Sequence, residues 1–377
     1  MKKIIFHTSR ILLALVFLIS STLKAIDPLG TTFKLSDYFV HVFGLPEMFS
    51  VALPLAFILN SIEFILGITL LFNALDKVTS LLFWTLMIIF TPLTFYLALK
   101  NPITDCGCFG DAIKLTNWQT FAKNIVFIIL FLPYQFLKKI FKTRLTNKCQ
   151  KLITTTAILV AFSFQLYNYN YLPIIDFRPY KEGTNIKQAM AFPPDAPQDQ
   201  YQTVLVYKNK KTGELKEFTE DNFPWQDTLT WQWVETRSKL IKRGYIPPIH
   251  DFAVIDSSEN DITDSVLNLP VAIFIVSYDL NKTNIRGIQK VKKFVPILAQ
   301  KLNAPVFWLT GSSKETINQI KQKYNINLPF YTSDETALKT FIRANPGIVI
   351  LKQGTIVKKL HFHLLNKKNI EKLCSKI

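Results

Sequence analysis

Hydrophobic residues are concentrated in the first half of the chain, where they form five long runs separated by polar turns. The runs cover residues 11–25, 51–72, 78–99, 118–136 and 152–167. A helix of about 20 predominantly apolar residues is long enough to cross a bilayer, so the pattern predicts five membrane-spanning helices. The first run follows basic residues, as a signal peptide does, but it lacks a convincing cleavage site, and we expect an uncleaved helix.

The second half of the chain shows a different pattern, with short apolar stretches in place of long runs. A polar, proline-punctuated segment at 173–200 is followed by two strand-like stretches around a turn, which predicts a hairpin over 203–218. From residue 246 onward, short apolar strands alternate with helical stretches, which is typical of an α/β sheet covered on both faces.

These patterns divide the chain into five parts. We predict an all-α membrane bundle of four helices at 1–137, a basic loop at 138–151, a fifth membrane helix at 152–172, a tether with a β-hairpin and a Trp-rich extension at 173–245, and an α/β domain at 246–377.

Net charge is +17, which by itself would suggest a nucleic-acid ligand. Six of the basic residues, however, lie between the fourth and fifth apolar runs, and the positive-inside rule predicts that such a loop is cytoplasmic. The N-terminus is then cytoplasmic as well, and everything after residue 171 is extracytoplasmic. We therefore expect a multi-pass protein of a bacterial inner membrane, with the lipid bilayer and an extracytoplasmic protein as partners and no nucleic acid.

Two of the four cysteines, Cys106 and Cys108, lie one residue apart in the loop between the third and fourth runs. Cysteines at this spacing can close a small-ring disulfide of the labile, exchange-competent kind. The alternatives are a structural disulfide, a well-made turn without thiol chemistry and a pair of metal ligands. No histidine lies in the loop, so we predict no metal there.

The residues around the cysteine pair fit a tight loop on the extracytoplasmic side. Gly107 and Gly110 permit sharp reversal of the chain, Phe109 lies between the second cysteine and the second glycine, and Asp105 and Asp111 can cap the flanking helices. The two carboxylates would also raise the pKa of the thiols by like-charge repulsion, which counts against a highly reactive thiolate.

Glu63 lies near the middle of the second apolar run. An ionisable group at that depth is costly and marks a functional interior by default. A catalytic or proton-handling role for Glu63 competes with a structural hydrogen bond to another helix, made through Asn60 or Ser61.

Residues 1–137 resemble the DoxX and MauE superfamily of four-helix membrane proteins, whose MauE branch is named for methylamine utilisation. The resemblance is carried by Lys24–Gly30, Glu63–Gly67, Thr91–Thr94, Asn101–Asp111 and Leu115–Trp118. It implies an integral membrane component of envelope redox or of disulfide formation in partner proteins.

Residues 246–363 are similar to thioredoxin-like domains of envelope thiol–disulfide and peroxidase-related proteins, on the strength of Pro247–Phe252 and of the closing hairpin after Pro346. The resemblance implies that Pro346 is the cis-proline of that fold. Where those domains carry Cys-x-x-Cys, this chain has Ser277–Leu280. Thiol exchange is therefore not available at that position, and we expect a docking module. Fusions of this kind are found in DoxX family proteins of Bacteroidetes-like bacteria.

Three functions are compatible with these features. In the first, Cys106 and Cys108 cycle between dithiol and disulfide, and their electrons leave through a membrane quinone or another protein. In the second, the protein is a non-catalytic scaffold whose thioredoxin-like domain binds a partner. The third is a transporter built around Glu63, which lacks the internal repeat typical of transporters. The sequence leaves open whether the chain is itself an enzyme.

Overall fold

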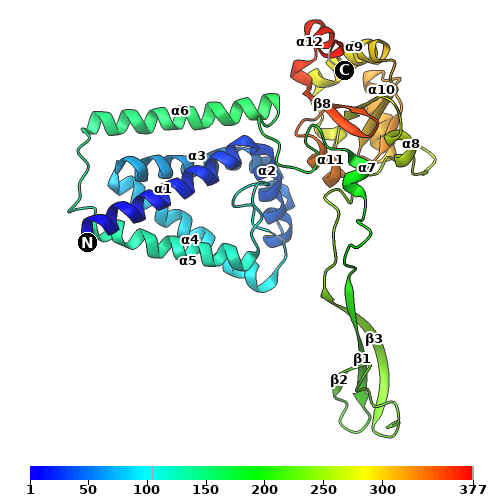
Figure 1. Ribbon diagram of the computed structural model, residues 1–377, viewed down its shortest axis with the longest axis horizontal. Coiled ribbons are helices and arrows are strands. Elements are labelled where there is room, and N and C mark those ends of the chain that lie inside the picture. Colours follow the sequence, from blue (N-terminus) through cyan, green and yellow to red (C-terminus); the bar gives the residue numbers. More distant parts are fainter. Residues whose placement is uncertain (104, 376–377) are drawn as a thin grey trace. The chain divides into compact units, whose positions relative to one another are not determined.

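The computed structural model describes residues 1–103 and 105–375, so that Thr104 of the cysteine loop and the last two residues of the predicted α/β domain lie outside the described residues. The chain forms two compact units (Figure 1). One comprises residues 1–184 together with 252–377, and the other comprises residues 185–251.

Five helices in the described part of the chain are long and apolar enough to cross a membrane, which confirms the predicted number. They are α1 (Lys2–Ile26), α3 (Phe49–Phe72), α4 (Asp76–Lys100), α5 (Asn117–Leu137) and α6 (Asn147–Tyr171). Helix α1 begins at residue 2 and not at 11, and α6 begins at 147 and not at 152, because both helices continue through basic residues at the membrane edge. The start of α6 is set by Thr146, whose side chain caps the helix by accepting from Cys149 N.

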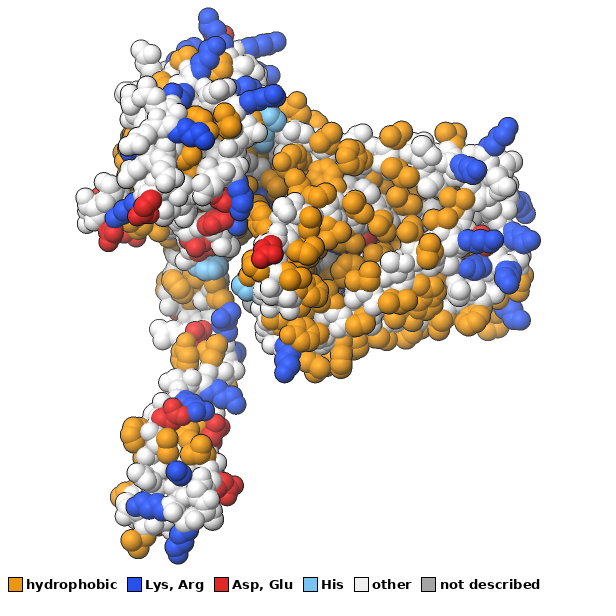
Figure 2. All heavy atoms as spheres, turned by 180° about the vertical axis from the view of Figure 1, so that it is seen from behind, with side chains coloured by type: hydrophobic (Ala, Val, Ile, Leu, Met, Phe, Trp, Pro, Cys, Tyr) orange, Lys and Arg blue, Asp and Glu red, His pale blue; other side chains and the backbone are white. Residues whose placement is uncertain are grey.

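The helices pack around an aromatic core. Helix α1 lies against α3 and α5, and α6 lies against α3. The rings of Phe83 and Phe131 are both fully buried and stack with their centroids 3.7 Å apart. Hydrophobic side chains cover the face of the bundle seen in Figure 2, and basic side chains gather at one end. The predicted basic loop contributes exposed residues to the basic set: Lys139, Lys142, Arg144, Lys148 and Lys151.

A short helical segment joins α1 to α3 at the opposite end of the bundle from the basic loop. It consists of α2 (Pro28–Asp37), a π-helix (Tyr38–Val42) and a 3-10 turn (Pro46–Met48). The carboxylate of Asp27 caps α2 by accepting from Gly30 N at 2.9 Å. This segment covers the loop that carries the cysteine pair.

The α/β domain is built on a five-stranded sheet with the order β6-β5-β4-β7-β8. Strands β4, β5 and β6 are parallel, whereas β7 pairs antiparallel with both β4 and β8. Two strand–helix units followed by an antiparallel hairpin and a last helix form the thioredoxin-like arrangement, so the predicted fold class is confirmed. The strands are β4 (Ala272–Val276), β5 (Val306–Thr310), β6 (Phe330–Thr332), β7 (Gly347–Lys352) and β8 (Thr355–His361), and the helices are α8 (Thr263–Leu267), α9 (Ile285–Leu302), α10 (Lys314–Tyr324), α11 (Glu335–Phe341) and α12 (Lys367–Cys374).

The peptide bond between Asn345 and Pro346, immediately before β7, is cis. It lies beside the end of β4, because Asn345 Nδ2 donates to the carbonyl oxygen of Asp279 at 2.8 Å. The loop that replaces Cys-x-x-Cys and the cis-proline loop are therefore neighbours at one edge of the domain.

The smaller unit contains α7 (Ile186–Met190) and a three-stranded antiparallel sheet of order β2-β1-β3. Strands β1 (Gln200–Asn209) and β2 (Leu215–Thr219) form the predicted hairpin. The Trp-rich extension is a third strand, β3 (Trp231–Lys242), which pairs with β1 and which the sequence analysis did not predict.

Candidate functional site

The loop between α4 and α5 holds Cys106 and Cys108 as a disulfide, with their Cα atoms 5.5 Å apart. Cys106 is buried at 8% exposure, and its sulfur lies 3.3 Å from Thr120 Oγ1 on α5. The hydroxyl of Tyr38 donates to the carbonyl oxygen of Cys106 at 3.0 Å. Contacts from two other segments therefore fix the position of the disulfide.

Glycine is required at two positions of this loop. Gly107 and Gly110 have φ values of +65° and +59°, which disfavour any residue with a Cβ. A Cβ on Gly107 would also lie 2.8 Å from Cγ of Lys34. Helix α2 thus packs closely on the loop, and a larger residue at 107 would separate them.

The prediction that Asp105 and Asp111 cap the flanking helices is wrong. The end of α4 is formed by Asn101 in the left-handed conformation, and α5 begins with a capping box from Thr116. Asp105 instead accepts from Gly107 N at 3.0 Å and pairs with Lys34 at 3.3 Å. Asp111 pairs with Arg343 of the α/β domain at 2.9 Å.

These ion pairs change the expected effect of the acidic residues on the thiols. The sequence alone shows no partner for the carboxylate of Asp105 or of Asp111. Each carboxylate has a cation in the folded chain, Lys34 for one and Arg343 for the other. The negative potential at the cysteines is reduced accordingly.

Glu63 is connected to the disulfide loop through the first helix. Its Oε1 accepts from Lys24 Nζ at 2.6 Å, and the hydroxyl of Ser20 lies 3.2 Å from its Oε2. The same hydroxyl lies 2.7 Å from the carbonyl oxygen of Cys108. A buried ion pair and one hydroxyl therefore connect the intramembrane carboxylate to the backbone of the second cysteine.

The alternative hydrogen bond of Glu63 through Asn60 or Ser61 is not the one formed. Those two side chains bind Gln165 on α6, with Asn60 Nδ2 donating to Oε1 and Gln165 Nε2 donating to Ser61 Oγ, both at 3.1 Å. They attach the fifth helix to α3, whereas Glu63 pairs with α1.

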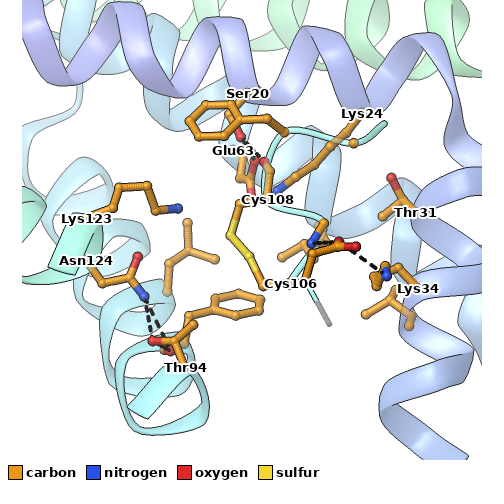
Figure 3. A pocket seen from close by; sticks show the side chains of 18 of the residues that line it. Ser20, Lys24, Thr31, Lys34, Glu63, Thr94, Cys106, Cys108, Lys123 and Asn124 are labelled. Carbon is orange, nitrogen blue, oxygen red and sulfur yellow. Dashed lines mark hydrogen bonds and ion pairs between the residues drawn. A yellow bond between two sulfur atoms is a disulfide. The ribbon is translucent and has the colours of Figure 1, made fainter. Parts of the chain in front are cut away.

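A cavity of about 90 Å³ lies beside the disulfide, and the side chains around it are drawn in Figure 3. The polar groups that line it include Ser20, Lys24, Glu63 and Lys123, and the loop from Asp105 to Asp111 forms part of its wall. The apolar lining comes from α1, α2, α3, α4, α5 and the cysteine loop: Val16, Phe17, Leu35, Leu59, Leu86, Met87, Phe90, Phe109 and Phe127.

The thioredoxin-like domain contacts the segment that covers this loop. The ring of Tyr278, in the stretch that replaces Cys-x-x-Cys, meets Phe33 of α2 edge-on with centroids 5.9 Å apart. Arg343, three residues before the cis-proline, pairs with Asp27 at 2.8 Å and with Asp111. The edge that carries the cysteines in thioredoxin-like enzymes thus lies against α2 and the end of the cysteine loop.

Charge holds this contact together. The side chain of Arg343 is only 6% exposed, and that of Asp27 is 13% exposed. Burial is the largest single influence on the pKa of Asp27 and would raise it, but the charges of Arg343 and Arg178 and the hydrogen bonds from Arg343 and Gly30 together lower the pKa. Asp27 is therefore ionised at neutral pH, and the contact depends on an arginine that the sequence analysis did not single out.

The other two cysteines, Cys149 and Cys374, are free. Within the described ranges 1–103 and 105–375, no group of three or more His, Cys, Asp or Glu side chains could hold a metal ion. The cysteine pair in the loop forms the one disulfide among the described residues.

Comparison with known proteins identifies two family matches. Residues 2–136 match the family described as methylamine utilisation protein MauE, and residues 201–243 match a domain of unknown function, DUF8463. A search of curated proteins finds no match.

Several solved structures are similar to about a third of the chain. They include a putative protein disulfide isomerase from Bacteroides thetaiotaomicron (12% identity, 33% of this chain and 82% of that one, TM-score 0.27) and yeast Sco1 (15%, 34% and 92%, 0.27). A third is the thioredoxin domain of a thiol-disulfide oxidoreductase from Bacteroides vulgatus (14%, 33% and 90%, 0.25). The N-terminal membrane bundle thus matches the MauE family model over residues 2–136, and it is followed by a domain of thioredoxin-like topology without the Cys-x-x-Cys motif.

Proposed function

We propose that this protein takes part in thiol–disulfide redox chemistry of the bacterial cell envelope, with Cys106 and Cys108 as its redox pair. The observation that carries the proposal is the position of the disulfide, which lines a cavity within a membrane bundle and is connected through Ser20 to the Glu63–Lys24 ion pair. A structural disulfide stabilises a protein mainly by closing a loop in the unfolded chain. Between residues two positions apart that loop is very short, so the disulfide would contribute little stability in this way.

The chemistry is a thiol–disulfide exchange with an extracytoplasmic protein dithiol. A partner thiolate attacks one sulfur, the other sulfur leaves as a thiolate, and the second partner thiol then resolves the mixed disulfide. The partner loses two electrons and two protons and becomes a disulfide, and Cys106 and Cys108 become a dithiol. Because Cys108 is more exposed than Cys106, we assign Cys108 as the sulfur that is attacked.

The environment of the pair fits these roles. Thr120 Oγ1 lies 3.3 Å from the sulfur of Cys106 and donates to the carbonyl oxygen of Thr116 at 3.0 Å. Its hydroxyl must turn to the sulfur to stabilise it as a leaving thiolate. We assign Glu63 to proton handling at the pair. Ser20 connects it to the backbone carbonyl oxygen of Cys108 and not to a sulfur, so protons would pass between Glu63 and the thiols across the cavity that they line. These are the catalytic roles that we assign to the intramembrane carboxylate and the cysteine pair.

The charge distribution supports an inner-membrane location with the cysteine loop outside. The basic loop at 138–151 and the cysteine loop lie at opposite ends of α5, since this helix begins just after one loop and ends just before the other. Because the positive-inside rule makes the basic loop cytoplasmic, we assign the cysteine loop and the thioredoxin-like domain to the extracytoplasmic compartment, where disulfides persist.

A non-catalytic scaffold is the second candidate. It is favoured by one specific observation: the thioredoxin-like domain has no cysteine at Ser277–Leu280, and this edge is occupied by its contact with α2. In this version the domain would bind a partner, and the disulfide would be inert.

The redox state of the pair in native membranes distinguishes the two candidates. Trapping with a mass-tagged maleimide should find Cys106 and Cys108 oxidised at rest, reduced by mild dithiothreitol, and oxidised again after the reductant is removed. The variants Cys106→Ser and Cys108→Ser are the matched controls, because each leaves one thiol that cannot re-form the pair. A pair that stays free, or that resists reduction in folded protein, would contradict the redox function and favour the scaffold.

A further inference from the structure

The cavity beside the disulfide is lined by apolar side chains together with ionisable ones, among them Lys24, Glu63 and Lys123. Nine apolar side chains line it, and four of them are phenylalanines. Its volume of about 90 Å³ accommodates several water-sized groups. This is smaller than the roughly 150 Å³ cavity that binds benzene, so a single-ring head group is the largest that it can take once its side chains adjust. Part of the wall belongs to the membrane helices α1, α3, α4 and α5, and the rest to the α2 segment and the cysteine loop at their end, so a molecule dissolved in the bilayer can reach the cavity from the helices.

Lys123 supplies a cation for which no described residue provides a hydrogen-bond acceptor. Its ammonium points into the cavity from α5 (Figure 3) and lies 5.1 Å from the ring of Phe127 and 5.5 Å from that of Phe109. No described residue forms an ion pair or a hydrogen bond with it. A donor of this kind inside an apolar cavity is costly unless an acceptor is supplied.

A second polar group in the same cavity is also unsatisfied. The hydroxyl of Thr31, on α2, is buried and has no hydrogen-bond partner among the described residues. Figure 3 shows Thr31 across the disulfide from Lys123. A ligand with acceptor oxygens would satisfy groups of this kind, whereas a lipid acyl chain would leave them unpaired.

The redox function requires an electron acceptor that the cysteines do not supply. After one exchange, Cys106 and Cys108 hold two electrons and two protons. Cys149 and Cys374 are single thiols, far from the pair in the sequence, and the thioredoxin-like domain has no Cys-x-x-Cys. The electrons must therefore leave by a route other than a second dithiol within the chain.

From these four observations we propose that the cavity is a binding site for a membrane quinone, with Lys123 donating a hydrogen bond to one quinone carbonyl. This inference rests on the redox function proposed above. The Cys106–Cys108 dithiol transfers two electrons and two protons to the quinone, the S–S bond forms, and a hydroquinone leaves into the bilayer. Lys123 stabilises the negative charge that develops on the carbonyl oxygen during the transfer.

The test uses the full-length protein in lipid nanodiscs with decylubiquinone as the probe. After reduction with dithiothreitol and removal of the reductant, decylubiquinone should reoxidise the pair, as followed by mass-tag trapping and by ultraviolet absorbance of the quinone. Lys123→Met should slow this reaction about tenfold to a hundredfold, the range for loss of one charge-assisted hydrogen bond. Lys100→Met, at an exposed lysine at the end of α4, should leave the rate unchanged.

A second variant removes space and keeps the charge. Val16→Phe adds a ring to a residue that lines the cavity and should weaken decylubiquinone binding while the pair still reacts with dithiothreitol. If both variants reoxidise at the wild-type rate, or if decylubiquinone never reoxidises a pair that dithiothreitol reduces, the quinone site is wrong and the redox function stands. If dithiothreitol does not reduce the pair but decylubiquinone binds in a Lys123-dependent manner, the redox function is wrong and the cavity remains a quinone site.

Discussion

Replacing Arg343 with methionine is expected to release the thioredoxin-like domain from α2 and the cysteine loop, and to speed reduction of the Cys106–Cys108 disulfide by a water-soluble phosphine at least about tenfold. The substitution removes both ion pairs of Arg343 and leaves the carboxylate of Asp27 largely buried without its cation. Breaking a buried ion pair on one side typically costs about 3–5 kcal/mol. If about 1.4 kcal/mol of that cost favours opening of the contact between the domain and α2, the fraction of molecules with an open contact rises tenfold.

Arg286→Met is the matched control for this variant, because Arg286 belongs to the same domain but is exposed on α9. Its phosphine reduction rate should equal that of the wild type. Hydrogen exchange should show faster exchange of α2 and of residues 105–111 in Arg343→Met only. Equal reduction rates in both variants, with unchanged exchange of α2, would mean that the contact does not protect the loop.

Replacing Lys24 with methionine should produce the largest loss of stability in the membrane bundle. The side chains of Lys24 and Glu63 are 8% and 9% exposed, and their charged atoms are 2.6 Å apart. Without Lys24, a carboxylate remains uncompensated inside the bundle, at a cost of about 3–5 kcal/mol. The thermal transition of the purified protein in detergent should fall, and less folded protein should be recovered from membranes.

A double-mutant cycle separates the pair from its surroundings. Lys24→Met combined with Glu63→Gln removes both charges and should recover most of the stability lost by Lys24→Met alone, because no unpaired charge remains. Lys100→Met should change little. Additive losses in the double variant would contradict a direct pairing of Lys24 with Glu63.

The sequence predicted those parts of the molecule that local pattern determines. Runs of apolar residues predicted the five helices, and the alternation of short strands with helices predicted the α/β domain. Both patterns can be recognised from residues close together in the sequence, because they show which faces of a single helix or strand are buried. The third strand of the small sheet was missed. Strand β3 is mostly exposed, so it lacks the apolar alternation by which strands are recognised.

The site was predictable only in part, because its electrostatics depend on residues distant in sequence. The cysteine pair and Glu63 were evident from their positions alone. Lys24 and Arg343 were not, since only the fold brings Lys24 to Glu63 and brings Arg343 to Asp27 and Asp111. The acidic residues were assigned as helix caps for the same reason, as their actual partners come from α2 and from the C-terminal domain.

The measurement that tests the central claim most directly is the equilibrium reduction potential of the Cys106–Cys108 pair in native membranes. It would be obtained by mass-tag trapping across a series of dithiothreitol ratios, with Cys108→Ser as the control that cannot form the pair. The redox function predicts a reversible two-electron titration at a potential above about −300 mV, the level below which structural disulfides of secreted proteins typically lie. A pair that titrates well below that level, or that cannot be reoxidised, would contradict it.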